Sequence, residues 1–144
     1  MMDHDLHVMV LDSDVELLSP LYRLLSNRGC RVATYSSPWG AFDYAEEETP
    51  DAILTSLDFP GFYGMEIVRR LRQASSDSRI IVLSPEDRLV SPEEVRDAGG
   101  DAKVSKSLLG EQLLPLFRNL RKARGTRTRS GYGFLETGPA GGRR

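Results

Sequence analysis

The chain has 144 residues, of which 40% are hydrophobic, and this is enough for one core of ordinary size with a short extension. Its single cysteine, Cys30, can form no disulfide within the chain, and the N-terminal residues lack the apolar stretch of a signal peptide, so we expect a cytoplasmic protein. No apolar run approaches the roughly 20 residues that a membrane-spanning helix needs.

The two ends of the chain differ in charge. Residues 1–117 carry 11 lysines and arginines against 20 aspartates and glutamates, whereas residues 118–144 carry 8 against 1. Residues 123–144 are rich in glycine and arginine without a packing period, which predicts a disordered basic tail after a domain of residues 1–122. A solubilising end is the simplest interpretation of this tail, and contact with nucleic acid, an anionic membrane or the acidic domain itself is the alternative.

Five short apolar segments recur along the chain. They are residues 7–11, 31–35, 52–54, 79–83 and 102–104. Apolar residues at consecutive positions are typical of strands that are covered on both faces, as in a parallel sheet. Between these segments, apolar residues three and four positions apart predict amphipathic helices, the first of them between Val15 and Leu25.

Capping residues and prolines refine the helix predictions. Residues 91–94 read Ser-Pro-Glu-Glu, which offers an N-cap serine, a proline at the first helical position and a glutamate at the third. Pro20 and Pro115 fall inside predicted helices, where proline removes a backbone donor. We therefore expect kinked helices or, for the first helix, a later start at Ser19.

Alternating strands and helices with right-handed crossovers predict an α/β fold, a (βα)5 doubly wound sheet of five parallel strands with helices on both faces. Ligands bind such sheets where the carboxyl ends of the strands converge. The residues predicted at those ends are mostly polar. They are Asp12, Ser13, Asp14, Ser56, Asp58, Ser84 and Lys106.

Five motifs, in order, resemble those of response-regulator receiver domains of bacterial two-component systems. They are Val10–Asp14, Pro50–Ser56, Phe59–Gly64, Ile81–Ser84 and Ala98–Lys106. The resemblance covers roughly residues 6–122 and implies the flavodoxin-like receiver fold. In receivers, two acidic residues after the first strand and an aspartate after the third hold Mg²⁺, and this aspartate takes a phosphoryl group from a histidine kinase. A hydroxyl residue and a lysine then engage the phosphoryl oxygens.

Three positions match that pattern and two depart from it. Asp12 takes the first acidic position, Ser84 the hydroxyl position and Lys106 the lysine position, but Ser13 stands where the second acid is expected. Ser56 occupies the phosphoacceptor position, and a serine hydroxyl cannot form an acyl phosphate. With Asp12 as the one remaining acid, we expect at most weak Mg²⁺ binding and no other cofactor.

Two further positions bear on signalling. Lys103 stands where receivers usually carry an aromatic residue that moves inward on activation, and a lysine resists such burial because its charge is costly to desolvate. Ser107 replaces the proline that commonly follows the lysine. Lys106, facing a nearly uncharged pocket, is expected to pair with Asp12 or Asp58.

The leading interpretation is a stand-alone, non-enzymatic pseudo-receiver that binds proteins without phosphorylation. The resemblance implies a histidine kinase or another two-component partner, docked on the fourth helix, fifth strand and fifth helix, with self-association as an open alternative. A second hypothesis is a conventional phosphorelay receiver with a displaced acceptor at Asp58, two residues after Ser56. A third is a nucleic-acid or membrane tether that uses residues 118–129.

Other candidate sites are weaker. His4 and His7 are three residues apart, which on a strand points them to opposite faces and argues against a shared metal ion. Trp39, at the start of the second predicted helix, is expected to pack rather than to anchor a partner. The sequence has no phosphate-binding loop, nucleophile elbow or paired-cysteine motif, so enzymatic activity is not expected.

Overall fold

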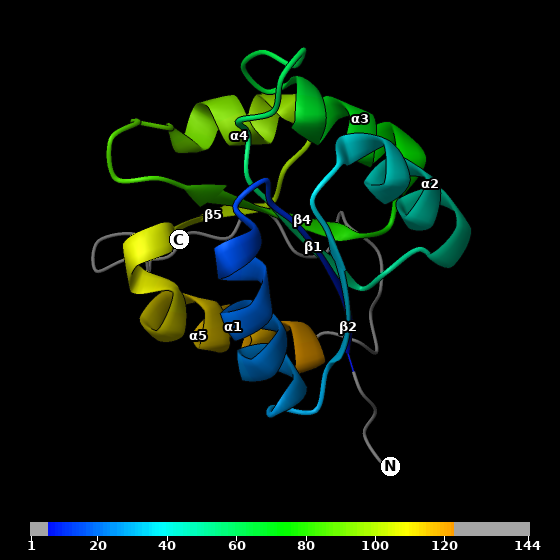
Figure 1. Ribbon diagram of the computed structural model, residues 1–144, viewed down its shortest axis with the longest axis vertical. Helices are drawn as coiled ribbons and strands as arrows, with labels where there is room; N and C mark the ends of the chain where they lie inside the picture. The colour runs from blue at the N-terminus through cyan, green and yellow to red at the C-terminus, as the bar shows by residue number, and fades with distance from the viewer. Residues whose placement is uncertain (1–5, 123–144) are drawn as a thin grey trace.

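One sheet of five parallel strands runs through the middle of the computed structural model, which describes residues 6–122 (Figure 1). The strands are β1 (His7–Leu11), β2 (Arg31–Tyr35), β3 (Ala52–Thr55), β4 (Arg79–Ser84) and β5 (Ala102–Ser105). The helices are α1 (Val15–Ser26), α2 (Pro38–Glu48), α3 (Glu66–Ala74), α4 (Pro92–Ala98) and α5 (Leu109–Lys122), with a 3₁₀ turn at Lys106–Leu108. The strand order is β2-β1-β3-β4-β5, so the predicted doubly wound α/β fold is confirmed.

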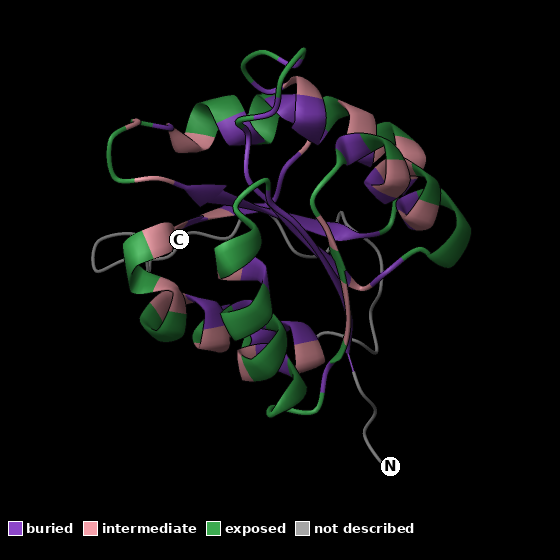
Figure 2. Cartoon of the chain, in the orientation of Figure 1, coloured by how far each residue is buried: buried purple, intermediate pink, exposed green. Residues whose placement is uncertain are grey.

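Two hydrophobic cores lie on opposite faces of the sheet. Alternate side chains of β1 separate into them: Val8 and Val10 face α1 and α5, whereas Met9 and Leu11 face α2, α3 and α4. Burial is greatest along β1, β3 and β4, and the outer helix faces are exposed (Figure 2). Strand β2 is partly exposed because it lies at the edge of the sheet.

Helix α1 starts at Val15, earlier than the alternative start at Ser19 that the sequence also suggested. Asp14 is its N-cap, and its carboxylate Oδ1 accepts a hydrogen bond from the backbone N–H of Glu16 at 3.1 Å. The later start at Ser19 is therefore wrong. Pro20 lies inside the helix on the exposed side, where the lost backbone donor is outweighed by the cap and by the burial of the helix's inner leucines.

Helix α4 begins and ends as its sequence predicts. The Ser91 hydroxyl accepts from the backbone N–H of Glu94 at 3.0 Å, and the Glu94 carboxylate accepts from the backbone N–H of Ser91 at 3.1 Å. Gly99 ends the helix with a positive φ of 104°. Gly100 follows where a Cβ would lie 2.5 Å from Val95 Cγ1, so only glycine fits the close approach to α4.

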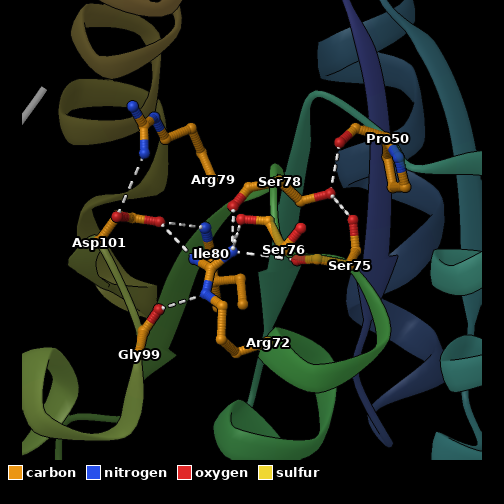
Figure 3. A network of polar contacts seen from close by, with 9 residues as sticks. All are labelled: Pro50, Arg72, Ser75, Ser76, Ser78, Arg79, Ile80, Gly99 and Asp101. Atoms are coloured by element: carbon orange, nitrogen blue, oxygen red, sulfur yellow. Dashed lines mark hydrogen bonds and ion pairs between the residues drawn. The ribbon is translucent and has the colours of Figure 1, made fainter. Parts of the chain in front are cut away.

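A buried polar network joins α3, β4 and β5 at the amino-terminal edge of the sheet (Figure 3). The carboxylate of Asp101 accepts from the backbone N–H of Ile80 and pairs with Arg72, both at 2.9 Å, and it faces Arg79 at 3.4 Å. The guanidinium of Arg72 also donates to the carbonyl of Gly99 and to three carbonyls after α3, those of Ser75, Ser76 and Ser78. One arginine thus fixes two loops against the sheet.

Candidate functional site

Polar residues gather at the carboxyl edge of the sheet, as the sequence predicts for a doubly wound fold. Asp12 follows β1, Ser56 follows β3, Ser84 ends β4 and Lys106 follows β5. Strand order places β1 next to β3, and the backbone N–H of Ser56 donates to the carbonyl of Leu11 at 2.9 Å. The ends of β1 and β3 are therefore directly adjacent.

Asp12 forms the charged centre of this edge. Its side chain is 1% exposed, Oδ1 accepts from the backbone N–H of Asp14 at 2.9 Å, and Oδ2 lies 2.9 Å from Lys106 Nζ. Of the two carboxylates considered as partners of Lys106, the structure therefore shows Asp12. This ion pair joins the loops after β1 and β5 across the carboxyl edge of the sheet.

Ser56 places a neutral hydroxyl at the end of β3, the strand next to β1, whose end carries Asp12. The residue is 3% exposed, and its carbonyl accepts from the Thr55 hydroxyl at 2.8 Å. The Ser56 Oγ is buried and has no hydrogen-bond partner within residues 6–122.

Asp58 and Ser13 lie at the outer rim of the pocket. The Asp58 side chain is 70% exposed, and its Oδ1 lies 2.8 Å from Arg88 Nη1. The Ser13 hydroxyl donates to the backbone carbonyl of Asp58 at 3.3 Å. Asp58 is therefore an exposed loop carboxylate that points to the loop before α4, and the buried position at the end of β3 belongs to Ser56.

Asp51, the aspartate of the Pro50–Ser56 motif, lies at the amino-terminal edge of the sheet, just before β3. Its Oδ2 accepts from the backbone N–H of His7 at 2.9 Å, beside the start of β1. Five residues separate it from Ser56, which corresponds to about 16 Å along a strand. Asp51 therefore does not contribute to the pocket around Asp12.

The remaining predicted positions lie along β4 and β5. Ser84 is buried, and its hydroxyl is 3.4 Å from the carbonyl of Val104. Lys103 pairs in register with Val82 and is partly buried, whereas the next residue along β5, Val104, is fully buried on the opposite face. The alternation of β5 thus directs Lys103 toward the α4 side of the sheet.

The loop between β4 and α4 is tied to both neighbouring loops. Glu86 accepts hydrogen bonds from the hydroxyls of Ser105, at 2.8 Å, and of Ser107, while Arg88 forms its ion pair with Asp58. The hydrogen bond from Ser107, followed by that from Ser105, lowers the pKa of Glu86 below its ordinary value. The sequence marks Ser107 as a replacement for proline but does not predict this contact, because no local pattern links Ser107 to Glu86.

The side chains around Asp12 do not fit Mg²⁺. This hard cation takes a near-octahedral set of oxygen ligands and usually one or two carboxylates. Asp12 is already neutralised by Lys106, and the Ser13 hydroxyl is directed to a carbonyl. Within residues 6–122, no group of three or more histidine, cysteine, aspartate or glutamate side chains could hold a metal ion.

Two residues singled out in the sequence take part in packing. His4 lies outside the described residues, whereas His7 is buried with its Nε2 2.5 Å from the Tyr44 hydroxyl. Trp39 is exposed on one side and packs against Phe42 and Phe62, with the Arg70 guanidinium over its ring at 5.4 Å. Within residues 6–122, no helix is long and apolar enough to cross a membrane.

The buried His7 predicts a loss of stability in mild acid. Burial, and then the charge of Arg31, lowers its pKa below the ordinary value of 6.5, although Asp51 and Glu48 oppose this. The unfolded chain therefore binds a proton on His7 more readily than the folded chain does. Stability present above about pH 6.5 is lost as the pH falls through the lowered pKa.

Denaturant titrations between about pH 5 and pH 8 test this expectation. The parent chain should lose more unfolding free energy on acidification than His7→Gln, which has no titrating ring. His4→Gln removes the other histidine and should follow the parent. If parent and His7→Gln respond equally to pH, His7 does not carry the effect.

The sequence matches the family described as response regulator receiver domain over residues 8–118. The chain therefore belongs to this family. Several solved structures share the fold. A CheY-like receiver domain from Methanospirillum hungatei JF-1 has a TM-score of 0.76 at 17% identity, over 88% of this chain and 100% of that one. A receiver domain protein from Clostridium thermocellum has a TM-score of 0.74 at 20% identity, over 83% and 97%.

The curated relatives include full response regulators. Transcriptional regulatory protein PrrA of Mycobacterium tuberculosis is 30% identical over 132 residues, which cover 92% of this chain and 57% of PrrA. Response regulator MprA of Mycolicibacterium vanbaalenii is 31% identical over 113 residues, which cover 78% of this chain and 49% of MprA. The chain thus spans about half the length of the relatives it matches.

Proposed function

We propose that this receiver domain works in two-component signalling as a protein-binding module without a phosphorylation step. The observation that carries the proposal is Ser56, a neutral, buried residue at the end of β3, next to the end of β1 where Asp12 pairs with Lys106. An acyl phosphate requires a carboxylate at the attacking position. The domain accordingly has no catalytic step of its own and needs no metal ion.

The contacts around the pocket support a single resting arrangement. Lys106 is held by Asp12, and the loop between β4 and α4 is held by Glu86 on one side and Arg88 on the other. In a switching receiver, the lysine and this loop must be free to respond to a phosphoryl group. Here Lys106 and this loop are already engaged by side chains of the chain itself.

The proposed partner is a two-component protein such as a histidine kinase. It binds the face formed by α4, β5 and α5, which is flanked by exposed apolar residues, Leu89 at 98% and Leu108 at 39% exposure. If a partner covers these two leucines, their burial contributes roughly 25 cal/mol per Å² of apolar surface to the contact. A second copy of the chain is the alternative occupant of the same face.

A phosphorelay receiver that uses Asp58 is the competing function. Its support is the exposed carboxylate two residues after Ser56, which a donor can reach. Its weakness is position, because Asp58 pairs with Arg88 on the exposed rim, whereas Lys106 pairs with the buried Asp12.

Intact-mass measurement after incubation with a small-molecule phosphodonor and Mg²⁺ separates the two. We expect no phosphoryl group on the parent chain or on Asp58→Asn, because both carry Ser56 rather than a carboxylate at the end of β3. The double variant Ser13→Asp/Ser56→Asp restores both missing carboxylates and is expected to gain one phosphoryl group. A receiver domain with an intact acceptor aspartate, treated in parallel, shows that the donor is active.

The outcome that contradicts the proposal is equally specific. If the parent chain gains a phosphoryl group that Asp58→Asn removes, the domain is a relay protein with a displaced acceptor. A label that survives Asp58→Asn but is lost in Ser56→Ala would instead mark Ser56 as the modified residue and would also overturn the proposal.

A further inference from the structure

Helices α1 and α5 share an uneven distribution of charge. Each has its only acidic residue in the first turn, Glu16 in α1 and Glu111 in α5, and basic residues toward its end. Both helices run antiparallel to the strands, so their ends meet at the edge of the sheet opposite Asp12 (Figure 1). Positive charge therefore collects at the ends of these two helices, away from the receiver pocket.

A cleft of about 340 Å³ lies where these two helices end. It is lined by Arg28, Leu114, Phe117, Arg118 and Arg121. The guanidinium of Arg121 donates to the carbonyl of Arg28 at 2.7 Å, which holds the loop between α1 and β2 against α5. Three arginines from two separate segments thus line one cleft, and the contact of Arg121 with the carbonyl of Arg28 joins the two segments.

The surroundings of the cleft strengthen its positive charge. Residues 17–31 and 112–122 contain no aspartate or glutamate, and they add Arg23 and Lys122, both exposed. Arg31 is left out of this surface because it lies near His7, where the charges of Glu48 and Asp51 also act. We call Arg23, Arg28, Arg118, Arg121 and Lys122 the α1/α5 basic surface.

We infer that the α1/α5 basic surface binds the phosphate backbone of nucleic acid without reading its sequence. Arginine presents a planar fork of donors that matches phosphate oxygens, and contacts to phosphates position a protein without specifying bases. From Lys122 the chain continues into residues 123–144, which add five arginines and one glutamate. The charge of the surface and that of the following segment thus have the same sign.

A membrane surface is a poorer fit to the same residues. Helices that lie in the interface of a bilayer insert exposed apolar side chains beside their charges. Of the two apolar residues in the cleft, Phe117 is only 3% exposed and forms part of the core between α5 and the sheet, and Leu114 is half-buried. Complementing the helix dipoles is a second reason for basic residues at helix ends, but it does not account for Arg28, which lies beyond α1.

Fluorescence anisotropy of the full chain with a labelled DNA duplex of about 20 bp tests this inference. We expect two unrelated sequences to bind equally. If three phosphates are neutralised, affinity should fall about 40-fold between roughly 50 and 200 mM salt. Arg28→Gln/Arg118→Gln should weaken binding several-fold at low salt and reduce the salt slope by about 2, because each lost phosphate contact lowers it by about 1.

The matched control is Arg69→Gln/Arg96→Gln, which removes the same charge from exposed positions on α3 and α4. It should bind as the parent does. The inference is wrong if no duplex binding occurs at low salt, or if both double variants lose affinity equally. It is also wrong if deleting residues 123–144 abolishes binding that the Arg28→Gln/Arg118→Gln change leaves intact.

Vesicles with anionic headgroups provide the remaining comparison. Binding to such vesicles, but not to the duplex, would make the surface a membrane contact and overturn the inference. Unfolding curves of every variant show whether it is folded. The test is independent of the proposed receiver function, because it uses no phosphodonor and no residue of the pocket around Asp12.

Discussion

Asp101→Ala is expected to lower the free energy of unfolding by about 3–5 kcal/mol, the usual cost of breaking a buried ion pair from one side. Asp101 is 3% exposed, and its carboxylate accepts from the backbone N–H of Ile80 and pairs with the guanidinium groups of Arg72 and Arg79. Removing it takes away the counter-charge of both arginines. It also leaves the backbone N–H of Ile80 without its acceptor. Chemical denaturation of parent and variant measures the loss.

Asp97→Ala is the matched control, since Asp97 is an exposed carboxylate on α4 and its removal should change the unfolding free energy by no more than about 0.5 kcal/mol. Asp101→Asn should fall between the two, because an amide oxygen still accepts from Ile80 but carries no charge. If Asp101→Ala were as mild as Asp97→Ala, the network in Figure 3 would not stabilise the fold.

This network also explains how the receiver framework persists while its pocket changes. Arg72 and Asp101 link α3, β4 and β5 at the amino-terminal edge, whereas Asp12, Ser56 and Lys106 lie at the carboxyl edge. The two sets share no residue and lie at opposite edges of the sheet. Substitutions that alter the pocket therefore leave the interactions at the other edge in place.

The sequence predicted the strands closely because their signal is local. Runs of consecutive apolar residues marked β1 and β2 at their observed bounds and the other three strands within one residue. The start of α1 was ambiguous because Asp14 and Ser19 are both acceptable caps. The burial of Leu18, which belongs to the core under α1, favours the earlier start and is a tertiary effect that no capping pattern contains.

The sequence predicted where the residues of the candidate site lie, but not which of them contact one another. Spacing along the chain placed Asp12, Ser56 and Lys106 at the ends of strands, because the carboxyl ends of parallel strands share one edge. Whether Lys106 pairs with Asp12 or Asp58 depends on how two loops fold, and the sequence left this open. The contact between Glu86 and Ser107 depends in the same way on loop conformation, across 21 residues of chain.

The ion pair between Lys106 and Asp12 predicts a second large effect on stability. Lys106→Met leaves the Asp12 carboxylate, 1% exposed, without its counter-charge, and we expect a loss of about 2–3 kcal/mol. The value is below that expected for Asp101→Ala because the Lys106 side chain is 25% exposed and solvent screens part of the interaction. Denaturant unfolding measures it, with Lys122→Met at the exposed end of α5 as the control for losing a lysine.

The double variant Asp12→Asn/Lys106→Met tests the cause, since it removes the buried charge together with its partner. It should recover most of the stability lost in Lys106→Met, because an amide pays a smaller desolvation cost than an unpaired carboxylate and still accepts from the backbone N–H of Asp14. If the double variant were less stable than Lys106→Met, the charge of Asp12 would not be what Lys106 compensates. Recovery would mean that the lysine that receivers use to meet a phosphoryl group serves here to neutralise the pocket's own carboxylate.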